Sequence, residues 1–185
     1  MIDDIAFLDD ATRPRAPKLT GLRPDQRAAG EHLKEIHDHL RHNMEVLREM
    51  IGRAAAGTLD KAELDRTTDD LAMVRNFRRF GTLCGQYCQF VHGHHSIEDA
   101  AVFPGLAAKS EALRKVTERL QAEHHVVHEL LVRLIGALNA LLEAPAPETF
   151  ANARTIYEAL ERVLLSHLGY EEEEIGDALG YYGMF

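Results

Sequence analysis

Stretches that would place the chain in or across a membrane are missing from the sequence. Its 185 residues hold no apolar run long enough to span a bilayer. The first ten residues carry acids where a secretion signal needs a basic start and an apolar run. Basic stripes are missing too, because the formal net charge is −9 and the acids are spread along the chain. We therefore expect no nucleic acid and no membrane among the partners.

Cysteine is scarce, and the two that occur lie four residues apart. Cys84 and Cys88 fall within one expected helix, where this spacing puts the Cβ atoms about 5–6 Å apart. An unstrained disulfide needs its Cβ atoms roughly 3.5–4.5 Å apart, so we expect two free thiols in the core, with a redox role as the alternative. This low cysteine content predicts a cytoplasmic location.

No stretch shows the alternating pattern of a β-strand. An N-terminal extension, residues 1–24, holds three prolines and no sustained period. After it, apolar residues recur every three or four positions, as in amphipathic helices. The expected helices span about residues 25–56, 60–103, 109–143 and 148–175, and the last of them leads into a glycine-rich end at 176–183.

Capping and breaking residues set the limits of the second helix. Asp60 followed by Glu63 predicts a capping box at its start, and Pro104 with Gly105 is expected to stop it. Four helices with short connections predict an all-α fold, an antiparallel up-down-up-down four-helix bundle that occupies residues 25–185 as one domain.

Histidine, unlike cysteine, is plentiful, with eleven in the chain. Five of them and two glutamates fall on the apolar stripes of the four expected helices. Burying an unpaired polar or charged group costs several kcal/mol, and a bound cation removes that cost. In an alternating bundle all these positions meet at one end. The candidate metal ligands are His37, His94, Glu98, His124, His128, His167 and Glu171.

The number of candidate ligands predicts more than one metal ion. Ligands four residues apart stand above one another on a helix, so each such pair presents two donors to the interior. Seven ligands are too many for one ion, whereas two six-coordinate ions offer about twelve positions. Five imidazoles, two bridging carboxylates and a bridging oxo or hydroxo group leave about one position open for a small ligand.

The arrangement H...HxxxE...HxxxH...HxxxE, with the run HHSIEDAAVFP at residues 94–104, resembles the hemerythrin family and its HHE cation-binding relatives. The resemblance covers about residues 25–175. It implies a non-haem di-iron centre with an oxo or hydroxo bridge, and carboxylate bridges from Glu98 and Glu171. One iron would be held by His124, His128 and His167, and the other by His37 and His94. Ligand chemistry alone also suits manganese or zinc.

The chain departs from the family pattern at one point. Members that carry O2 usually place an aspartate five residues after the last histidine, and Glu172 stands there instead. We take Glu171 as the bridge and Glu172 as its alternative. His39 and His125 are rivals of His37 and His124, since a shift of one or two residues would exchange them.

Other polar residues have weaker claims on the site. We expect the remaining histidines to be solvated or to support the ligands from outside. Asp99 and Glu123 neighbour ligands in sequence, and they could orient imidazole N–H groups. Tyr87 and Tyr170 either pack in the core, which we favour, or donate to a bound oxygen species. The remaining histidines are His32, His39, His42, His92, His95 and His125.

The ligand composition favours reversible binding over oxidation. Ferritin-like di-iron oxidases use Glu-x-x-His pairs, and this chain has none. A centre rich in histidine and poor in carboxylate has less negative charge to stabilise high-valent iron. We expect a hemerythrin-like protein that binds a small diatomic ligand, O2 or NO. The alternatives are a di-iron oxidoreductase that removes peroxide or reduces NO, and an iron or oxygen sensor. Whether the protein is an enzyme, and its oligomeric state, stay open.

Overall fold

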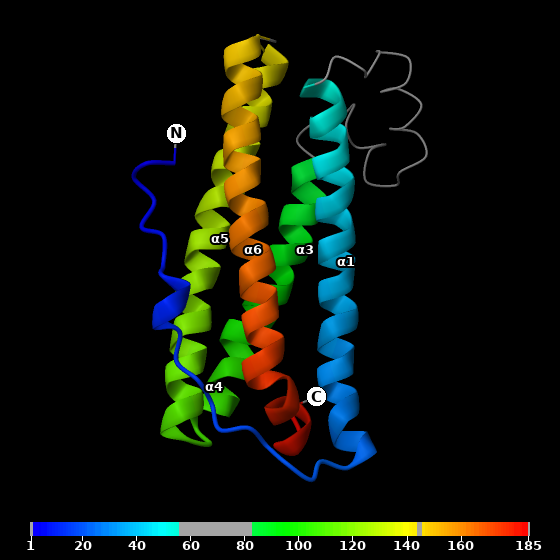
Figure 1. The fold of residues 1–185 in the computed structure, drawn as a ribbon, viewed down its shortest axis with the longest axis vertical. Coiled ribbons are helices and arrows are strands. Elements are labelled where there is room, and N and C mark those ends of the chain that lie inside the picture. Colours follow the sequence, from blue (N-terminus) through cyan, green and yellow to red (C-terminus); the bar gives the residue numbers. More distant parts are fainter. Residues whose placement is uncertain (1, 56–82, 144–145, 185) are drawn as a thin grey trace.

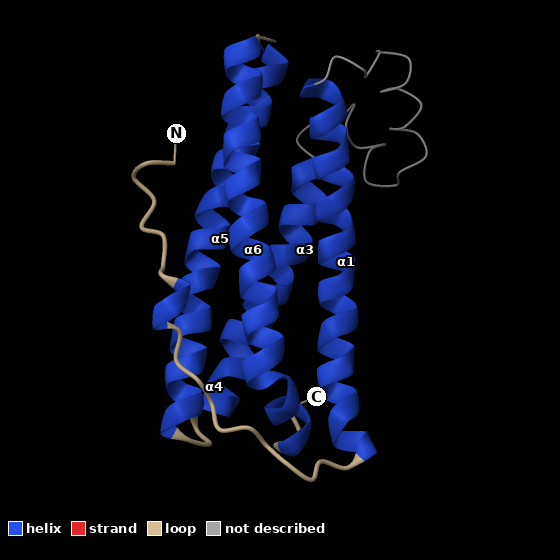
Figure 2. Cartoon of the chain, viewed as in Figure 1, coloured by secondary structure: helices blue, strands red, loops and turns tan. Residues whose placement is uncertain are grey.

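The computed structural model describes residues 2–55, 83–143 and 146–184. Apart from the N-terminal extension and the connecting loops these are helical, with no strand among them (Figure 2). This confirms the all-α class for the described part of the chain. The main helices are α1 (Pro24–Ala55), α3 (Leu83–Ile97), α5 (Glu111–Glu143) and α6 (Pro147–Tyr181). Within these residues, none of the helices combines the length and the apolar character needed to cross a membrane.

The second expected helix does not stop at Pro104. α3 runs directly into a π-helical turn, η3 (Glu98–Val102), and then into the short helix α4 (Phe103–Ala107). The backbone N–H of Phe103 donates to the carbonyl of Glu98, five residues back. Pro104 then lies in the first turn of α4, where a missing N–H costs no hydrogen bond. The capping box at residues 60–63 and the side chains of residues 84, 87 and 88 lie outside the described part.

The glycine-rich end of the last helix also continues as helix. α6 extends to Tyr181 because Gly176 and Gly180 face α1 rather than terminating the helix. A Cβ on Gly30 of α1 would lie 2.8 Å from the carbonyl oxygen of Gly176, and one on Gly180 would overlap the backbone of Gln26. These glycines therefore let the backbones of α1 and α6 approach closely.

The long helices lie side by side (Figure 1). Residues 2–23 run along α5 and then cross below the helices to reach α1. Polar contacts attach this extension to the helices: Arg133 of α5 pairs with Asp4, and the Tyr170 hydroxyl of α6 donates to the Pro14 carbonyl at 2.7 Å. The extension is thus fixed to two helices.

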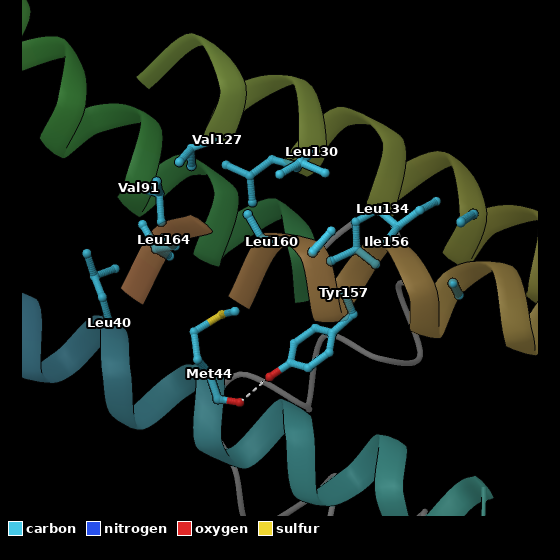
Figure 3. Close-up of a cluster of buried hydrophobic side chains, with 14 of the residues drawn as sticks. Leu40, Met44, Val91, Val127, Leu130, Leu134, Ile156, Tyr157, Leu160 and Leu164 are labelled. Atoms are coloured by element: carbon cyan, nitrogen blue, oxygen red, sulfur yellow. Dashed lines mark hydrogen bonds between the residues drawn. The ribbon is translucent and has the colours of Figure 1, made fainter. Parts of the chain in front are cut away.

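Two apolar clusters make up the core. The first core cluster is drawn in Figure 3, where the Tyr157 hydroxyl donates to the backbone carbonyl of Met44. It includes Leu40, Met44, Val91, Val127, Leu130, Leu134, Ile156, Tyr157, Leu160 and Leu164. The second core cluster includes Leu33, Val102, Phe103, Leu106, Leu113, Val116, Leu120, Ile175 and Leu179. Burial of this apolar surface is the main force that holds the helices together.

Buried polar side chains separate the two clusters along each main helix. In α1, His37 lies between Leu33 of the second cluster and Leu40 of the first. α5 has the same order around His124. In α3 with η3, the first cluster comes before the polar residues and the second comes after them. In α6 the first cluster ends at Leu168 and the second begins at Tyr170, beside the buried His167 and Glu171. The fold therefore encloses a polar layer between two apolar ones.

Candidate metal centre

Donor side chains from all four helical stretches gather in this polar layer. They form two groups, and within each group the ligand atoms lie within 4.8 Å of one another. The three-histidine group consists of His95, His124 and His167. The mixed group consists of His37, His94, Glu98 and Glu171. Every one of these side chains is buried or nearly so, which places the donors away from competing water.

Glu98 faces both groups. One helical turn separates it from His94, so the two side chains stand on the same face, with 3.1 Å between His94 Nε2 and Glu98 Oε1. The other carboxylate oxygen, Oε2, lies 3.7 Å from His124 Nε2 of the three-histidine group. The carboxylate is therefore positioned between the two sets of donors.

Glu171 occupies an equivalent place on α6. Its Oε2 lies 3.5 Å from the Nε2 of His167, one turn earlier on the same helix. The same oxygen lies 3.5 Å from the Nε2 of His37 in the mixed group. Two carboxylates from different helices thus lie where the two groups meet.

A second set of carboxylates lies behind the histidines. Each accepts a hydrogen bond from an Nδ1–H, because an ionised carboxylate can only accept, and this directs the Nε2 lone pair into the donor group. The arrangement confirms the expected orienting roles of Asp99 and Glu123. The pairs are His37 with Glu172 at 2.8 Å, His124 with Asp99 at 2.9 Å and His167 with Glu123 at 3.1 Å.

Arginines fix two of these outer carboxylates. Arg41 donates to Glu172 at 2.6 Å. Glu123 accepts two bonds from Arg13, at 2.9 and 3.0 Å, and one from Arg119 at 2.7 Å. Burial opposes ionisation of Glu123, but the hydrogen bonds from His167 and the two arginines outweigh it and lower its pKa to about 2. The carboxylate is therefore ionised and held in place.

Burial keeps four of the inward-facing imidazoles neutral. It lowers the pKa of His37 and of His94 to about 3 and that of His124 to about 4, and it lowers the pKa of His95 far below its usual range. Neutral imidazole is the form that binds a metal ion. Burial, together with the neighbouring carboxylate of Glu171, raises the pKa of Glu98 well above its usual range. Without a cation nearby, the site therefore favours the protonated form of that carboxyl group.

Six atoms of the centre are buried and have no hydrogen-bond partner. They are His95 Nε2, His124 Nε2, His167 Nε2, Glu98 Oε2 and both carboxylate oxygens of Glu171. An unsatisfied buried polar atom costs about 1–3 kcal/mol, so their clustering needs an explanation. All six belong to the two donor groups, and imidazole with carboxylate suits iron, manganese or zinc. The residues present therefore fit a bound metal.

Six of the seven ligands expected from the sequence belong to these groups. The exception is His128, which is half-buried and outside both groups, with its Nε2 3.2 Å from the Nδ1 of His95. His95, expected to be solvated or supporting, is instead fully buried in the three-histidine group. His39 and His125, the register rivals, are exposed.

Helix geometry explains why His95, and not His128, lies in the three-histidine group. His94 and His95 precede Glu98 by four and three residues, so both share its face of α3. Val91, which is fully buried, precedes His94 by three residues and His95 by four, so it lies on the same face as both. A stripe through residues 91, 95, 98 and 102 therefore fits the helical spacing as well as one through residues 91, 94, 98 and 102. On α5 the interior is taken by Val127, which leaves His128 at the edge, beside His95.

The outer residues Glu172 and Tyr170 also take definite positions. Glu172, the alternative bridge, contacts His37 Nδ1 and Arg41 and lies outside both donor groups. The Tyr170 hydroxyl donates to the Pro14 carbonyl, away from the centre, and the side chain packs in the second core cluster. The arginines that hold Glu123 and Glu172 were not anticipated, since nothing in their local sequence pattern marks them.

Comparison with known proteins agrees with this centre. The family model of the hemerythrin HHE cation-binding domain matches residues 28–179. This span includes all seven donors of the two groups. No curated protein and no solved structure is significantly similar to the chain. A match over most of the chain, together with the histidine and glutamate donors that it contains, shows that the protein belongs to the hemerythrin HHE cation-binding domain family.

Proposed function

We propose that the protein holds two non-haem iron ions and binds a small diatomic ligand, O2 or NO, reversibly. The observation that carries this proposal is the pairing of two donor groups around two shared carboxylates, with six buried donor atoms that have no other partner. A single ion would leave one of the groups unsatisfied.

In this proposal the three-histidine group holds one iron, and His37 with His94 holds the other. Glu98 and Glu171 bridge them, since each has an oxygen within 3.7 Å of a histidine from either group. An iron pair held in this way supplies a redox-active site where a small ligand can bind and leave.

The chain's own residues favour reversible binding. The three outer carboxylates, Asp99, Glu123 and Glu172, orient imidazoles and stay out of the donor groups, so the centre carries few negative charges. The two core clusters above and below the polar layer limit the access of water. The Tyr170 hydroxyl, which an enzyme could use as a proton donor, is committed to the Pro14 carbonyl. These features support a carrier over an oxidoreductase.

The proposal includes the antiparallel up-down-up-down bundle expected from the sequence. It is supported by the order of the core clusters, which runs from second to first along α1 and α5. It runs from first to second along α6 and along the path from α3 through η3 to α4. The colours in Figure 1, which follow the sequence, likewise show that the chain runs upward along α1 and α5 and downward along α6. Neighbouring helices of opposite direction bring the donors to one level.

Metal analysis combined with absorption spectroscopy tests the function. Protein from iron-supplemented cells is analysed for metal content, and its near-ultraviolet and visible spectrum is recorded before and after reduction and re-exposure to air or NO. We expect about two irons per chain and a band that appears with the ligand and disappears when it is removed. One zinc ion, or no metal, would contradict the proposal. Steady consumption of O2, peroxide or NO would favour the oxidoreductase.

A further inference from the structure

The N-terminal extension reaches the metal centre through one side chain. The Arg13 guanidinium makes two parallel bonds to Glu123, from Nε at 2.9 Å and from Nη2 at 3.0 Å. Its Nη1 donates to Ser166 Oγ at 2.9 Å, and the group lies 4.6 Å above the ring of Tyr170. Only 11% of this side chain is exposed, which is unusual for an arginine in an extension without long helices.

Contacts on both sides hold Arg13 in this place. Before it, Arg119 of α5 donates to the Thr12 hydroxyl and to the Asp9 carbonyl at 2.8 and 2.9 Å. After it, the carboxylate of Glu174 in α6 accepts from the backbone N–H of Ala16 at 2.6 Å. Residues 9–16, which we call the docked segment, are therefore attached to both helices that supply the three-histidine group's His124 and His167.

We propose that Arg13 is a positioning residue for the metal centre, so that docking of residues 9–16 and metal binding are coupled. This inference rests on the proposed function, since it assumes that the donor groups bind metal. The path has two steps. Arg13 fixes the carboxylate of Glu123, and Glu123 accepts from His167 Nδ1 at 3.1 Å, which aims His167 Nε2 at the other two histidines.

Arginine suits this role for a physical reason. Its planar guanidinium binds both oxygens of a carboxylate at once and so fixes the plane of that carboxylate as well as its charge. Arg119 contributes a single bond to Glu123, and only to Oε1. Without Arg13, the oxygen that contacts His167, Oε2, loses its arginine partner. The imidazole would then be less firmly oriented, and metal affinity would fall.

Thermodynamic linkage makes the effect reciprocal. If docking of the segment favours the metal-binding orientation of His167, metal binding must favour docking by the same factor. The extension would then respond to metal occupancy.

Arg15 provides a matched control in the same segment. It pairs with Glu174 at 2.7 Å and with Glu173, and neither of these carboxylates contacts a histidine of the donor groups. The Arg15 side chain is 61% exposed, so its replacement should leave the segment docked by its other contacts. The path from Arg13 through Glu123 to His167 also stays intact.

The experiment uses the full chain as wild type, Arg13→Ala and Arg15→Ala, each loaded anaerobically with Fe(II). We would measure iron per chain and the rate of iron release to excess chelator. Changing groups that support a ligand typically costs 10–100-fold in metal affinity, and Arg119 remains, so we expect Arg13→Ala to release iron about tenfold faster. Arg15→Ala should release iron at the wild-type rate. In wild type, hydrogen exchange of residues 9–16 should be slower with iron than without, and Arg13→Ala should abolish this difference.

The outcomes separate the two proposals. If wild type holds iron but Arg13→Ala releases it at the wild-type rate, the positioning role is refuted and the metal function stands. Equal acceleration in Arg13→Ala and Arg15→Ala would also refute it, since the effect would then not depend on the contact of Arg13 with Glu123. If wild type holds no iron, the proposed function and this inference both fail.

Discussion

Two glutamates on the ligand-bearing helices differ in what a substitution should do. Glu98 has an oxygen facing each donor group, whereas Glu172 contacts only the outer nitrogen of His37 and an arginine. Glu98→Ala should therefore lower the iron content to one ion or none. Glu172→Ala should still hold two ions at saturating iron but release one of them faster, by about 10–100-fold. Elemental analysis and chelator kinetics measure both, and retention of two tightly held irons by Glu98→Ala would exclude it as a bridge.

His95 and His128 offer a direct choice between the sequence pattern and the geometry. His95 Nε2 is one of the buried atoms without a partner, whereas the Nε2 of His128 lies outside both donor groups and contacts the outer nitrogen of His95. We expect His95→Ala to lose the iron of the three-histidine group. His128→Ala should keep both irons and bind that one about 10–100-fold more weakly. Iron titration measures both, with far-ultraviolet circular dichroism as a check on folding. The reverse ranking would restore His128 as the ligand.

These residues show how far the sequence could specify the site. Periodicity placed His37, His124 and His167 on buried faces, because one face of an amphipathic helix follows from spacing alone. It could not choose between neighbours such as His94 and His95, which are 100° apart on a helix and can both face inward when the helix is turned between them. Contacts between distant residues, such as Arg13 with Glu123, depend on tertiary packing and leave no local pattern.

Among the elements, the contact between α1 and α6 depends on an asymmetric pair of glycines. A Cβ on Gly30 would lie 2.8 Å from the Gly176 carbonyl oxygen, whereas a Cβ on Gly176 would find its nearest neighbour at 3.9 Å. Overpacking costs about 1–3 kcal/mol, and alanine recovers up to about 1 kcal/mol in helix propensity. Gly30→Ala should therefore lower the free energy of unfolding by about 1–2 kcal/mol.

Gly176→Ala is the matched control, because it adds the same methyl group on the other side of this contact. It should raise the free energy of unfolding by about 0.5–1 kcal/mol, since alanine loses less backbone entropy in a helix and meets no clash. Urea unfolding of the metal-free proteins measures both values. Equal effects of the two substitutions would show that the helices do not approach each other as closely as described.

The ends of a helix could be predicted where local residues terminate it, and less well where contacts with other helices determine its length. α1 and α5 lie within a few residues of the expected spans. The helical path through Pro104 was not foreseen, because the π-helical turn before it depends on the main-chain bond between Phe103 and Glu98. α6 continued through Gly176 and Gly180 because their missing side chains serve the contact with α1, which no pattern within α6 reveals.

Over the whole molecule, the polar layer divides the apolar core, so metal binding should affect global stability. Without metal, six buried polar atoms lack partners, each at a cost of about 1–3 kcal/mol. A ligand at 100 times its Kd stabilises the fold by about 2.7 kcal/mol, and about 1 kcal/mol shifts the Tm of a domain of this size by roughly 2–4 °C. Each bound iron at that concentration should thus raise Tm by about 5–10 °C, and a chelator should reverse the rise.

Calorimetry of the metal-free protein, with Fe(II) added anaerobically in steps, measures this shift. Tm should keep rising with iron concentration beyond saturation, because each further tenfold adds about 1.4 kcal/mol of stabilisation for each bound ion. Glu98→Ala, which loses a carboxylate that faces both donor groups, should show a smaller rise at every concentration. If iron leaves Tm unchanged, the buried polar atoms find their partners in another way. The donor groups would then be a structural feature of the core and no metal site.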